Sequence, residues 1–158
     1  MSMRLFGDAL AVCETAINSR HLTLLKKLDI VPDVYGSPDE LRQVLINLLS
    51  NAIEAVPTNG NLAVCATRYK SPKSGRGSVR LLIADDAPGM AASTKSHVFD
   101  PFFTTKNETG AGLGLWISRN IVESHGGKIR IHSSVGPQRH GTIVSLHFPS
   151  ISKNSAAV

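Results

Sequence analysis

The start of the chain contains two kinds of apolar pattern. Residues 5–18 (LFGDALAVCETAIN) place apolar side chains at a loose helical period. Residues 21–31 (HLTLLKKLDIV) instead alternate apolar and polar positions, as a strand with one buried face does. We therefore predict that the chain begins with a helix that leads into a strand.

A second helix has the clearest start signal in the sequence. Ser37 can cap free backbone N–H groups, Pro38 suits the first helical position, and Glu40 lies three residues after the cap. The apolar positions that follow keep a helical period as far as Pro57, which cannot continue a helix. These signals predict a helix over residues 38–56.

The rest of the chain contains more strands, one more helix and a long irregular stretch. This stretch runs from Asp85 to about Gly112, and irregular connections of this length in a compact domain usually act as lids or binding loops. The patterns predict strands over residues 61–69, 78–85, 128–133 and 142–148 and a helix over residues 113–124. The order of these elements predicts an α+β fold, a two-layer α/β sandwich in which helices cover one face of a mixed β-sheet.

The composition places the chain among soluble single-domain proteins. Its 158 residues are 42% hydrophobic and 18% charged, which is typical of a globular domain with one core. We expect one domain over residues 1–150 and a flexible tail over residues 151–158. The chain shows no signal peptide and no apolar run that could span a bilayer, so we expect a cytoplasmic fragment, with a larger membrane-bound parent left open.

Charge and cysteine usage narrow the function classes. The formal net charge of +5 fits either solubility or an anionic ligand. Basic side chains gather around the predicted loop 71–77 (SPKSGRG), but only Tyr69 offers an aromatic ring there, so we interpret this region as a solvated loop and expect no nucleic-acid partner. Cys13 and Cys65 lie far apart in apolar stretches, so we expect two reduced core residues and no zinc cluster.

Polar residues form a stripe along the predicted 38–56 helix. Asn47, Asn51 and Glu54 share one side of this helix at about 100° per residue. The opposite, apolar side is predicted to face the core and carries Leu45, Leu48, Leu49, Ala52 and Val56. Asparagine is a poor helix former, so two of them one turn apart need a reason. Two interpretations stay open: a solvated surface, or amide oxygens that bind a hard cation such as Mg²⁺.

A carboxylate lies at the end of the predicted 78–85 strand. Asp85 follows the apolar residues VRLLIA and opens the segment DDAPGM, which ends at Met90. A carboxylate at a strand end, next to a tight turn, can accept a hydrogen bond from an exocyclic amine such as that of adenine. The same residues also fit an ordinary turn that ends a strand.

Glycines and phenylalanines surround the start of the predicted 113–124 helix. The segment GAGLGL covers residues 110–115, and glycines at a helix start let backbone N–H groups approach an anion such as phosphate. The pattern does not follow a strand, so it is not the dinucleotide-binding form. The upstream segment over residues 99–106 (FDPFFTTK) contains aromatic rings that can dock a lid onto the rest of the domain. It also contains Lys106, whose charge can reach a terminal phosphate. A small satellite core under a long loop is the alternative interpretation.

Four segments, taken in order, resemble one protein family. LRQVLINLLSNAIEA, DDAPGM, FDPFFTTK and GAGLGL are similar to the N box, first glycine box, F box and second glycine box of the ATP-binding catalytic domain of sensor histidine kinases, within the GHKL superfamily. The resemblance extends through ISRNIVESHGGKIRIHSS and GTIVSLHFP and covers residues 5–149. The ending NAIEA resembles the nitrogen-regulator type of these kinases.

This resemblance implies a fold, two cofactors and a catalytic set. The fold would be the GHKL sandwich, with ATP and Mg²⁺ bound between the 38–56 helix and a mobile lid. Asn51 would bind the Mg²⁺ ion, with Asn47 beside it. Asn47, Asn51 and Lys106 would together be the catalytic residues.

The resemblance also implies which residues contact the nucleotide. Asp85 would accept the adenine amino group, Gly89 would shape that pocket, and Thr142 would support it. The residues implied at the phosphates are Lys106, Gly112 and Gly114. By their places in the matching boxes, the remaining expected contacts are Glu54, Met90, Thr104, Thr105, Gly110, Leu113 and Leu115.

Two features depart from the family pattern. Ala87 stands where family members usually carry glycine, which puts a methyl group in the turn beside the implied adenine pocket. None of the six histidines lies in a phospho-accepting His box. The resemblance therefore implies transfer of the γ-phosphoryl group of ATP to a histidine on a separate dimerisation domain of the parent kinase and, through it, signalling to a response regulator. We expect the isolated fragment to be a monomer without direct membrane contact.

Three other functions stay open at this point. An ATPase of the chaperone or mismatch-repair kind would need a carboxylate where Asn47 stands, to activate water. A stand-alone switch serine kinase or anti-sigma-type regulator fits the size, but the PFFTTK and GAGLGL segments favour the histidine-kinase branch. A non-enzymatic nucleotide-sensing module gains some support from Ala87.

Overall fold

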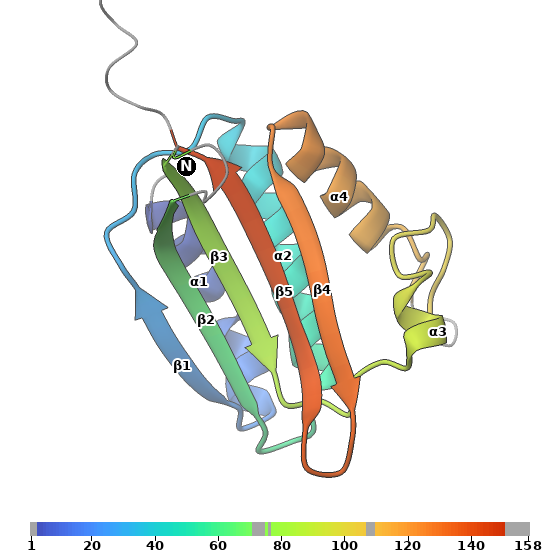
Figure 1. The fold of residues 1–158 in the computed structure, drawn as a ribbon. Helices are drawn as coiled ribbons and strands as arrows, with labels where there is room; N and C mark the ends of the chain where they lie inside the picture. The colour runs from blue at the N-terminus through green and yellow to red at the C-terminus, as the bar shows by residue number, and fades with distance from the viewer. Residues whose placement is uncertain (1–2, 71–74, 76, 107–109, 151–158) are drawn as a thin grey trace, which may run out of the picture.

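A computed structural model describes residues 3–70, 75, 77–106 and 110–150 (Figure 1). The expected tail over residues 151–158 and most of the expected 71–77 loop lie outside these residues. The helices are α1 (Met3–Ser19), α2 (Pro38–Ala55), α3 (Ala92–Lys95) and α4 (Gly114–Ser124), and the strands are β1 (Thr23–Leu28), β2 (Asn61–Lys70), β3 (Gly77–Asp85), β4 (Lys128–Val135) and β5 (His140–Pro149). No helix in these ranges is both long and apolar enough to cross a bilayer. Each helix and strand predicted from the sequence is present, with its ends shifted by a few residues.

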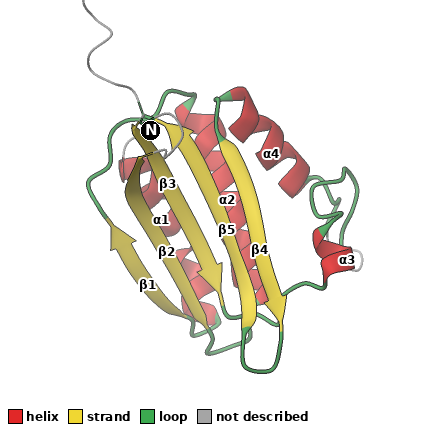
Figure 2. Ribbon diagram, viewed as in Figure 1, coloured by secondary structure: helices red, strands yellow, loops and turns green. Residues whose placement is uncertain are grey.

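The strands form one mixed sheet in the order β1-β2-β3-β5-β4. β1 runs parallel to β2, and the other neighbours are antiparallel. α1, α2 and α4 lie on one face of the sheet, and in the described part of the chain the other face carries no helix (Figures 1 and 2). The predicted two-layer sandwich, with helices on one face of a mixed sheet, is confirmed.

α2 forms the middle of the helical layer, between α1 and α4. It begins as predicted, because the Ser37 hydroxyl accepts the Glu40 N–H at 3.5 Å and Pro38 occupies the first turn. The side predicted to face the core is fully buried and consists of Leu45, Leu48, Leu49, Ala52 and Val56. Burial of each such leucine is worth about 2 kcal/mol. The apolar side is thus held against the core, which leaves the polar stripe facing α4 and the segment over residues 86–113 that joins β3 to α4, called the lid segment below.

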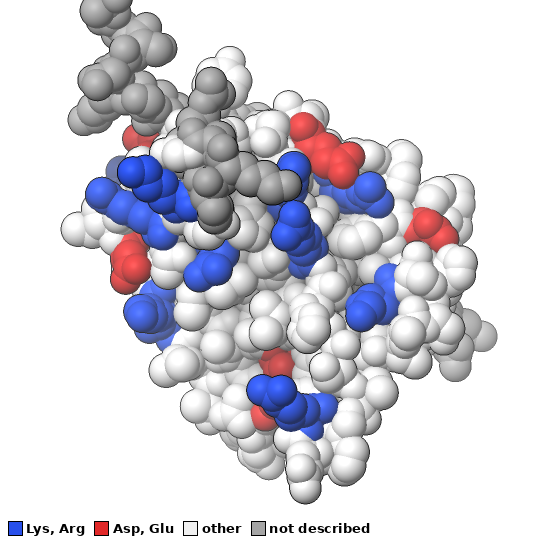
Figure 3. Space-filling model, in the orientation of Figure 1, with Lys and Arg blue, Asp and Glu red and all other residues white. Residues whose placement is uncertain are grey.

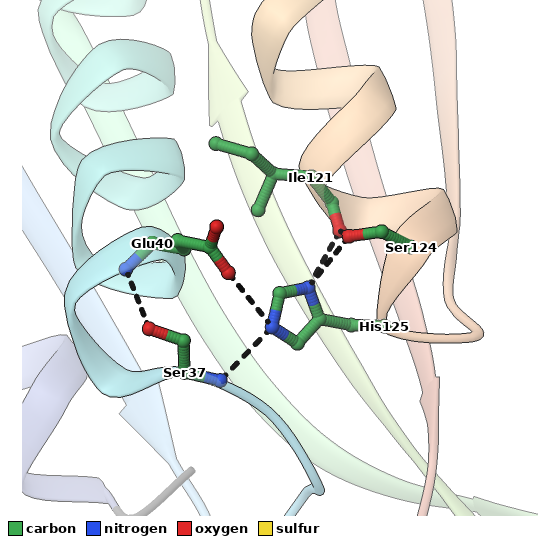
Figure 4. A network of polar contacts seen from close by, with 5 residues as sticks. All are labelled: Ser37, Glu40, Ile121, Ser124 and His125. Atoms are coloured by element: carbon green, nitrogen blue, oxygen red, sulfur yellow. Dashed lines mark hydrogen bonds and ion pairs between the residues drawn. The ribbon is translucent and has the colours of Figure 1, made fainter.

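A buried histidine joins the end of α4 to the start of α2 (Figure 4). His125 follows α4, and only 8% of its side chain is exposed. Its Nε2 accepts the Ser37 N–H at 2.9 Å and lies 3.3 Å from the Glu40 carboxylate. Because a backbone N–H can only donate, the ring proton of neutral His125 sits on Nδ1, which donates to the Ile121 carbonyl at 2.7 Å. These contacts hold the end of α4 against the N-terminal end of α2. This end of α2 lies on the opposite side of the molecule from the C-terminal end of β3 (Figure 1).

Cations gather on the open face of the sheet (Figure 3). Strand register and alternation place Arg80, Lys128 and Arg130 on this face, around His147. Burial lowers the pKa of His147, and the neighbouring Arg130 and Arg80 guanidinium groups lower it further. Part of the basic excess therefore lies on the opposite side of the sheet from the polar stripe of α2.

Two local expectations were wrong. Cys13 is buried, but Cys65 pairs with Leu82 on the open face of the sheet and is only half-buried, because alternation along β2 turns it away from the helices. Residues 92–95, inside the stretch without a predicted element, form α3. A four-residue helix is too short to show a period in the sequence.

Candidate nucleotide-binding site

The predicted site residues gather at one end of the molecule. The C-terminal half of α2, the end of β3 and the start of β5 lie at this end, and the lid segment leads from β3 to the start of α4 beside them (Figure 1). Antiparallel pairing places Asp85 of β3 opposite Thr142 of β5, and Thr142 opposite Ser133 of β4. Strand register therefore brings together side chains that are far apart in the sequence.

Asp85 is held by backbone N–H groups from two segments. Its Oδ1 accepts hydrogen bonds from the Ala87 and Thr142 N–H groups, each at 3.1 Å. Its Oδ2 has no hydrogen-bond partner within the described residues. Burial raises the pKa of Asp85 above its usual range; the two N–H groups oppose this rise, and the Asp86 charge adds to it. A carboxylate with one oxygen fixed and the other free is suited to accept a hydrogen bond from a ligand.

Two glycines near Asp85 are required by close backbone contacts. Gly89 has a φ of +83°, and a Cβ there would lie 1.9 Å from the Ser134 carbonyl oxygen. Gly141 has a φ of +124°, and a Cβ there would lie 2.2 Å from the Asp85 carbonyl oxygen. Gly89 was expected in the site from the sequence, whereas Gly141, directly before Thr142, was not. Both glycines let neighbouring segments lie directly against each other.

A buried serine that the sequence analysis missed connects these segments. Ser133 is 8% exposed, and its Oγ lies 2.8 Å from the Met90 nitrogen, 3.1 Å from the Gly141 carbonyl oxygen and 2.8 Å from the Thr142 Oγ1. The signal was present in the alternation of β4, where Ile131 marks the inward face and Ser133 is a polar residue at the next inward position. This hydroxyl ties the expected contact Met90 to the expected contact Thr142.

Ala87, the departure from the family pattern, is accommodated without strain. It is 3% exposed and belongs to the hydrophobic core, and its φ is not positive. Its carbonyl accepts a hydrogen bond from His140 Nδ1 at 3.0 Å. The turn therefore does not need the backbone conformation that only glycine adopts freely.

Asn47 lies where α2 meets α4. Its Nδ2 donates to the Ser118 hydroxyl at 2.9 Å, and Ser118 is 2% exposed. A Cβ on Gly114 would lie 2.5 Å from the Asn47 Oδ1. Gly114 therefore lets the start of α4 lie directly against the Asn47 side chain, a contact that the sequence did not reveal. Ser118, a polar residue on the buried side of α4, was also missed.

Asn51 and Glu54 both contact the ammonium group of Lys106. Lys106 Nζ donates to the Asn51 Oδ1 at 3.3 Å and forms an ion pair with the Glu54 carboxylate. Lys106 belongs to the lid segment, so this contact joins the lid to the polar stripe of α2. Two oxygen atoms of the stripe thus converge on one positive charge.

The same oxygen atoms fit a magnesium ion. Amide and carboxylate oxygens are hard ligands, and Mg²⁺ usually takes one or two protein ligands together with substrate phosphates. The Lys106 ammonium shows that Asn51 and Glu54 can share a cation. Across the described ranges, no group of three or more His, Cys, Asp or Glu side chains could hold a metal. Asn51 and Glu54 are thus the residues of the stripe whose oxygen atoms could hold such an ion.

Gly112, near the C-terminal end of the lid segment, packs against the backbone of Phe102 and Phe103 within the same segment. Gly112 has a φ of +70°, and a Cβ there would lie 2.5 Å from the Phe102 carbonyl carbon. Phe102 itself has a φ of +65° and is 74% exposed. Among the described residues, a Cβ on Gly110 would meet nothing closer than the Thr104 Oγ1 at 3.5 Å, and that oxygen accepts the Lys106 N–H at 3.0 Å. Packing therefore requires glycine at 112 and not at 110.

For three other expected contacts the structure shows no polar side-chain contact with the other site residues in the described ranges. Thr105 is exposed and forms no hydrogen bond within the described residues. Leu113 directly precedes α4, where its carbonyl accepts the Ile117 N–H at 2.8 Å. Leu115 packs against the hydrophobic core. Their expected roles at the nucleotide rest on their sequence positions.

Comparisons with known proteins show the family to which the chain belongs. The family model for histidine kinase-, DNA gyrase B- and HSP90-like ATPases matches residues 36–152. The chain is 40% identical over 146 residues to the sensor histidine kinase ZraS of Escherichia coli K12. The match covers 92% of this chain and 29% of that protein. It is 41% identical over 123 residues to the C4-dicarboxylate transport sensor protein DctB of Rhizobium meliloti, which covers 76% of this chain and 19% of that protein.

Solved structures show the same fold. The nucleotide-free catalytic domain of the histidine kinase ThkA superposes with a TM-score of 0.80 at 28% identity, over 95% of this chain and 93% of that one. The mycobacterial sensor histidine kinase MprB superposes with a TM-score of 0.79 at 26% identity, over 94% of this chain and 95% of that one.

The fold and the order of the boxes define an ATP-binding catalytic domain of the sensor histidine kinase type. The chain belongs to the family of histidine kinase-, DNA gyrase B- and HSP90-like ATPases. It spans less than a third of the length of the two curated relatives named above.

Proposed function

We propose that this domain binds Mg²⁺-ATP and transfers the γ-phosphoryl group to a histidine on a separate dimerisation domain of a sensor kinase. The observation that carries the proposal is the half-buried Asp85 carboxylate, in which Oδ1 is fixed by two backbone N–H groups and Oδ2 has no partner in the described residues. A free acceptor of this kind in a domain of an ATPase family is suited to the amino group of adenine.

The adenine ring is proposed to bind beside Asp85, with its amino group donating to Oδ2. Thr142 lies next to this position, since its N–H already binds the other carboxylate oxygen. The turn at Gly89 and Met90 borders the site and is tied to β4 through Ser133. Because these groups belong to the end of a packed sheet, the base would enter a preformed site.

The phosphates are proposed to bind between the polar stripe of α2 and the lid segment. Lys106 would supply a positive charge, and the start of α4, with Gly112 and Gly114, would supply backbone N–H groups. A magnesium ion bound by Asn51, with Asn47 or Glu54 beside it, would neutralise phosphate charge. Lys106, displaced from Asn51 and Glu54, would then be free to contact the terminal phosphate.

In the proposed transfer, the bond between the γ-phosphorus and the β–γ bridging oxygen breaks, and a bond to an imidazole nitrogen of the acceptor forms. ADP leaves with the bridging oxygen, and this chain contributes mainly positioning and positive charge. Asn47 has no carboxylate that could activate water, and its Nδ2 is bound to Ser118. We therefore expect slow ATP hydrolysis by the isolated domain.

The proposed partners are the dimerisation domain and, through it, a response regulator. The histidine kinase ThkA has been solved in complex with the response regulator TrrA; that chain superposes with a TM-score of 0.72 at 26% identity, over 95% of this chain and 41% of that one. This likeness supports the same type of partner here. We also propose that the fragment is monomeric and cytoplasmic, without nucleic-acid or direct membrane contact.

Calorimetry with the ATP analogue AMP-PNP tests the nucleotide site. We expect the wild-type domain to bind AMP-PNP more tightly with Mg²⁺ than with EDTA, and Asp85→Asn to bind it about 100-fold more weakly than the wild type. Absence of binding by the wild type, or an unchanged affinity in Asp85→Asn, would contradict the site assignment.

A transfer assay tests the acceptor. The domain is mixed with a histidine-containing dimerisation domain and γ-labelled ATP, and we expect acid-labile label on the acceptor. Label that survives acid, as phosphoserine does, would favour the switch serine kinase. Nucleotide binding with no transfer to the acceptor would favour the nucleotide-sensing module.

A further inference from the structure

Ser133 is a buried hydroxyl at the point where three segments of the site meet. It lies on β4 and contacts the Met90 nitrogen in the turn after β3. It also contacts the carbonyl of Gly141 and the hydroxyl of Thr142, both on β5. All three distances are between 2.8 and 3.1 Å, and only 8% of the Ser133 surface is exposed.

The directions of these hydrogen bonds follow from counting protons. A serine hydroxyl has one proton to donate and two lone pairs that can accept. The Met90 N–H can only donate, and the Gly141 carbonyl can only accept, so Ser133 accepts from the first and donates to the second. Its remaining lone pair must then accept the proton of the Thr142 hydroxyl. This is the arrangement in which all three contacts are hydrogen bonds.

The direction of the Thr142 proton decides what Thr142 offers to a ligand. With its proton turned toward Ser133, the Thr142 oxygen keeps only lone pairs, so it can accept but not donate. The neighbouring Asp85 Oδ2 is also an acceptor, and Asp85 is joined to Thr142 through the Thr142 N–H at 3.1 Å. Acceptor atoms on these two paired residues would favour a ligand amino group and disfavour a ligand carbonyl.

We propose that Ser133 is a positioning residue that sets base selectivity, because it orients the Thr142 hydroxyl and holds the Met90 turn against β4. The inference rests on the proposed function, since it needs the base to bind beside Asp85 and Thr142. The Gly89 contact supports it independently, because the turn lies so close to the Ser134 carbonyl that a Cβ at Gly89 would be 1.9 Å away. The turn is thus seated on β4 where Ser133 receives the Met90 N–H.

The test compares ligands that share phosphates but differ in the base. Ser133→Ala removes the hydroxyl and frees the Thr142 proton, while Ser133→Thr keeps a hydroxyl. Ser145→Ala is the matched control, because it removes a hydroxyl from β5 on the open face, opposite Arg130. Calorimetry measures AMP-PNP, GMP-PNP and tripolyphosphate, each with Mg²⁺, and thermal unfolding checks every variant.

In Ser133→Ala we expect the affinity for AMP-PNP to fall about tenfold, which corresponds to one or two lost hydrogen bonds. The affinity for tripolyphosphate is expected to stay unchanged, and the preference for AMP-PNP over GMP-PNP to shrink. Ser133→Thr is expected to keep most of the preference, and Ser145→Ala all of it.

Each other outcome identifies what failed. If the wild-type domain does not bind AMP-PNP, the proposed function fails. If the wild type binds but Ser133→Ala keeps the wild-type preference for the adenine analogue, only the role of Ser133 is overturned. An equal loss for AMP-PNP and tripolyphosphate would show that Ser133 merely maintains the fold, which also overturns the inference.

Discussion

The end of β3 and the lid segment, the two sides of the candidate site, are held together in different ways. Around Asp85, backbone N–H groups and the Ser133 hydroxyl join β3, β4 and β5 in one hydrogen-bonded network. On the other side, Lys106 reaches α2 through side-chain contacts to Asn51 and Glu54, and both members of the ion pair are more than a third exposed. The first side has its geometry set by a packed sheet, and the second depends on charges carried by flexible side chains.

This difference predicts two kinds of response to change. On the sheet side, small changes in hydrogen bonding should alter recognition of the base, because Asp85 Oδ1, Thr142 and Met90 are held in one hydrogen-bonded network. On the lid side, substitutions should affect ligand binding mainly through charge, and only for ligands that carry phosphates. They should have little effect on stability, since exposed ion pairs contribute little to folding.

The largest effect is expected for Asp85→Asn. The Asn oxygen can still accept the Ala87 and Thr142 N–H groups, which turns an NH₂ donor toward the adenine amine. Replacing an acceptor with a donor should cost about 100-fold in AMP-PNP affinity by calorimetry, or about 2.7 kcal/mol. Asp86→Asn is the control, because the Asp86 carboxylate binds Asn61 instead. A loss as large in Asp86→Asn would remove the distinction between the two carboxylates.

Asp85→Asn should also stabilise the unliganded domain. Burial raises the folded-state pKa of Asp85, so ionisation of Asp85 disfavours the folded state once the pH rises through that raised pKa. The neutral amide removes this cost. The variant should therefore have a higher melting temperature than the wild type at pH 7. The difference in melting temperature should disappear as the pH falls below the ordinary carboxyl pKa of about 4. A variant less stable than wild type at every pH would contradict this.

Alanine substitutions at two glycines of the lid segment, Gly112 and Gly110, should distinguish an effect of backbone packing from an effect of reduced chain flexibility. Gly112→Ala forces a Cβ onto the Phe102 backbone at a positive φ, so we expect a loss of about 2 kcal/mol in the free energy of unfolding. Gly110→Ala meets only ordinary contacts and should change the same quantity by less than about 0.5 kcal/mol. Chemical denaturation of both variants measures the difference, and equal effects would rule out the packing argument.

Lys106→Met should act on the phosphates alone. Removing the charge should weaken AMP-PNP binding about tenfold and leave adenosine binding unchanged, because the base contacts lie on the sheet side. The free energy of unfolding should change by less than about 1 kcal/mol, since the ion pair between Lys106 and Glu54 is exposed. Titrations with AMP-PNP and adenosine check this, with Lys95→Met on α3 as the control for loss of a lid charge. A parallel loss of adenosine binding would show that the two sides are coupled.

The smallest effect on binding is expected for Ala87→Gly, the change toward the family pattern. The Ala87 methyl is buried in the core, so its removal should lower the free energy of unfolding by about 1 kcal/mol. AMP-PNP affinity should change less than threefold, since the Ala87 N–H that binds Asp85 remains. A large gain in affinity would mean that the methyl group does obstruct the base.

The predictable part of the site consists of residues whose signal is local. The stripe of Asn47, Asn51 and Glu54 follows from helical spacing, and its helix starts at the predicted cap. Asp85 follows from its place at a strand end. These features depend only on residues within a few turns or one strand, so the sequence pattern is enough to place them.

Other parts needed contacts between distant segments. Ser133 is recognisable as an inward polar residue, but its partners Met90 and Thr142 lie on other segments and are chosen by register. Gly114 was assigned to phosphate from its motif, whereas the structure adds the close approach of Asn47 on another helix. Cys65 was expected in the core and faces the open side of the sheet.

By itself, the sequence determined the order and type of the elements, the polar and apolar sides of α2 and the four motifs that match the kinase family. It could do so because periodicity, capping and turn residues act between neighbours along the chain. Only the tertiary structure decided that Ser133 meets Thr142, that Lys106 reaches Asn51, and that Cys65 lies on the open face of the sheet. Those outcomes depend on strand register and helix packing, which are set by hydrogen bonds and burial between segments far apart in the chain.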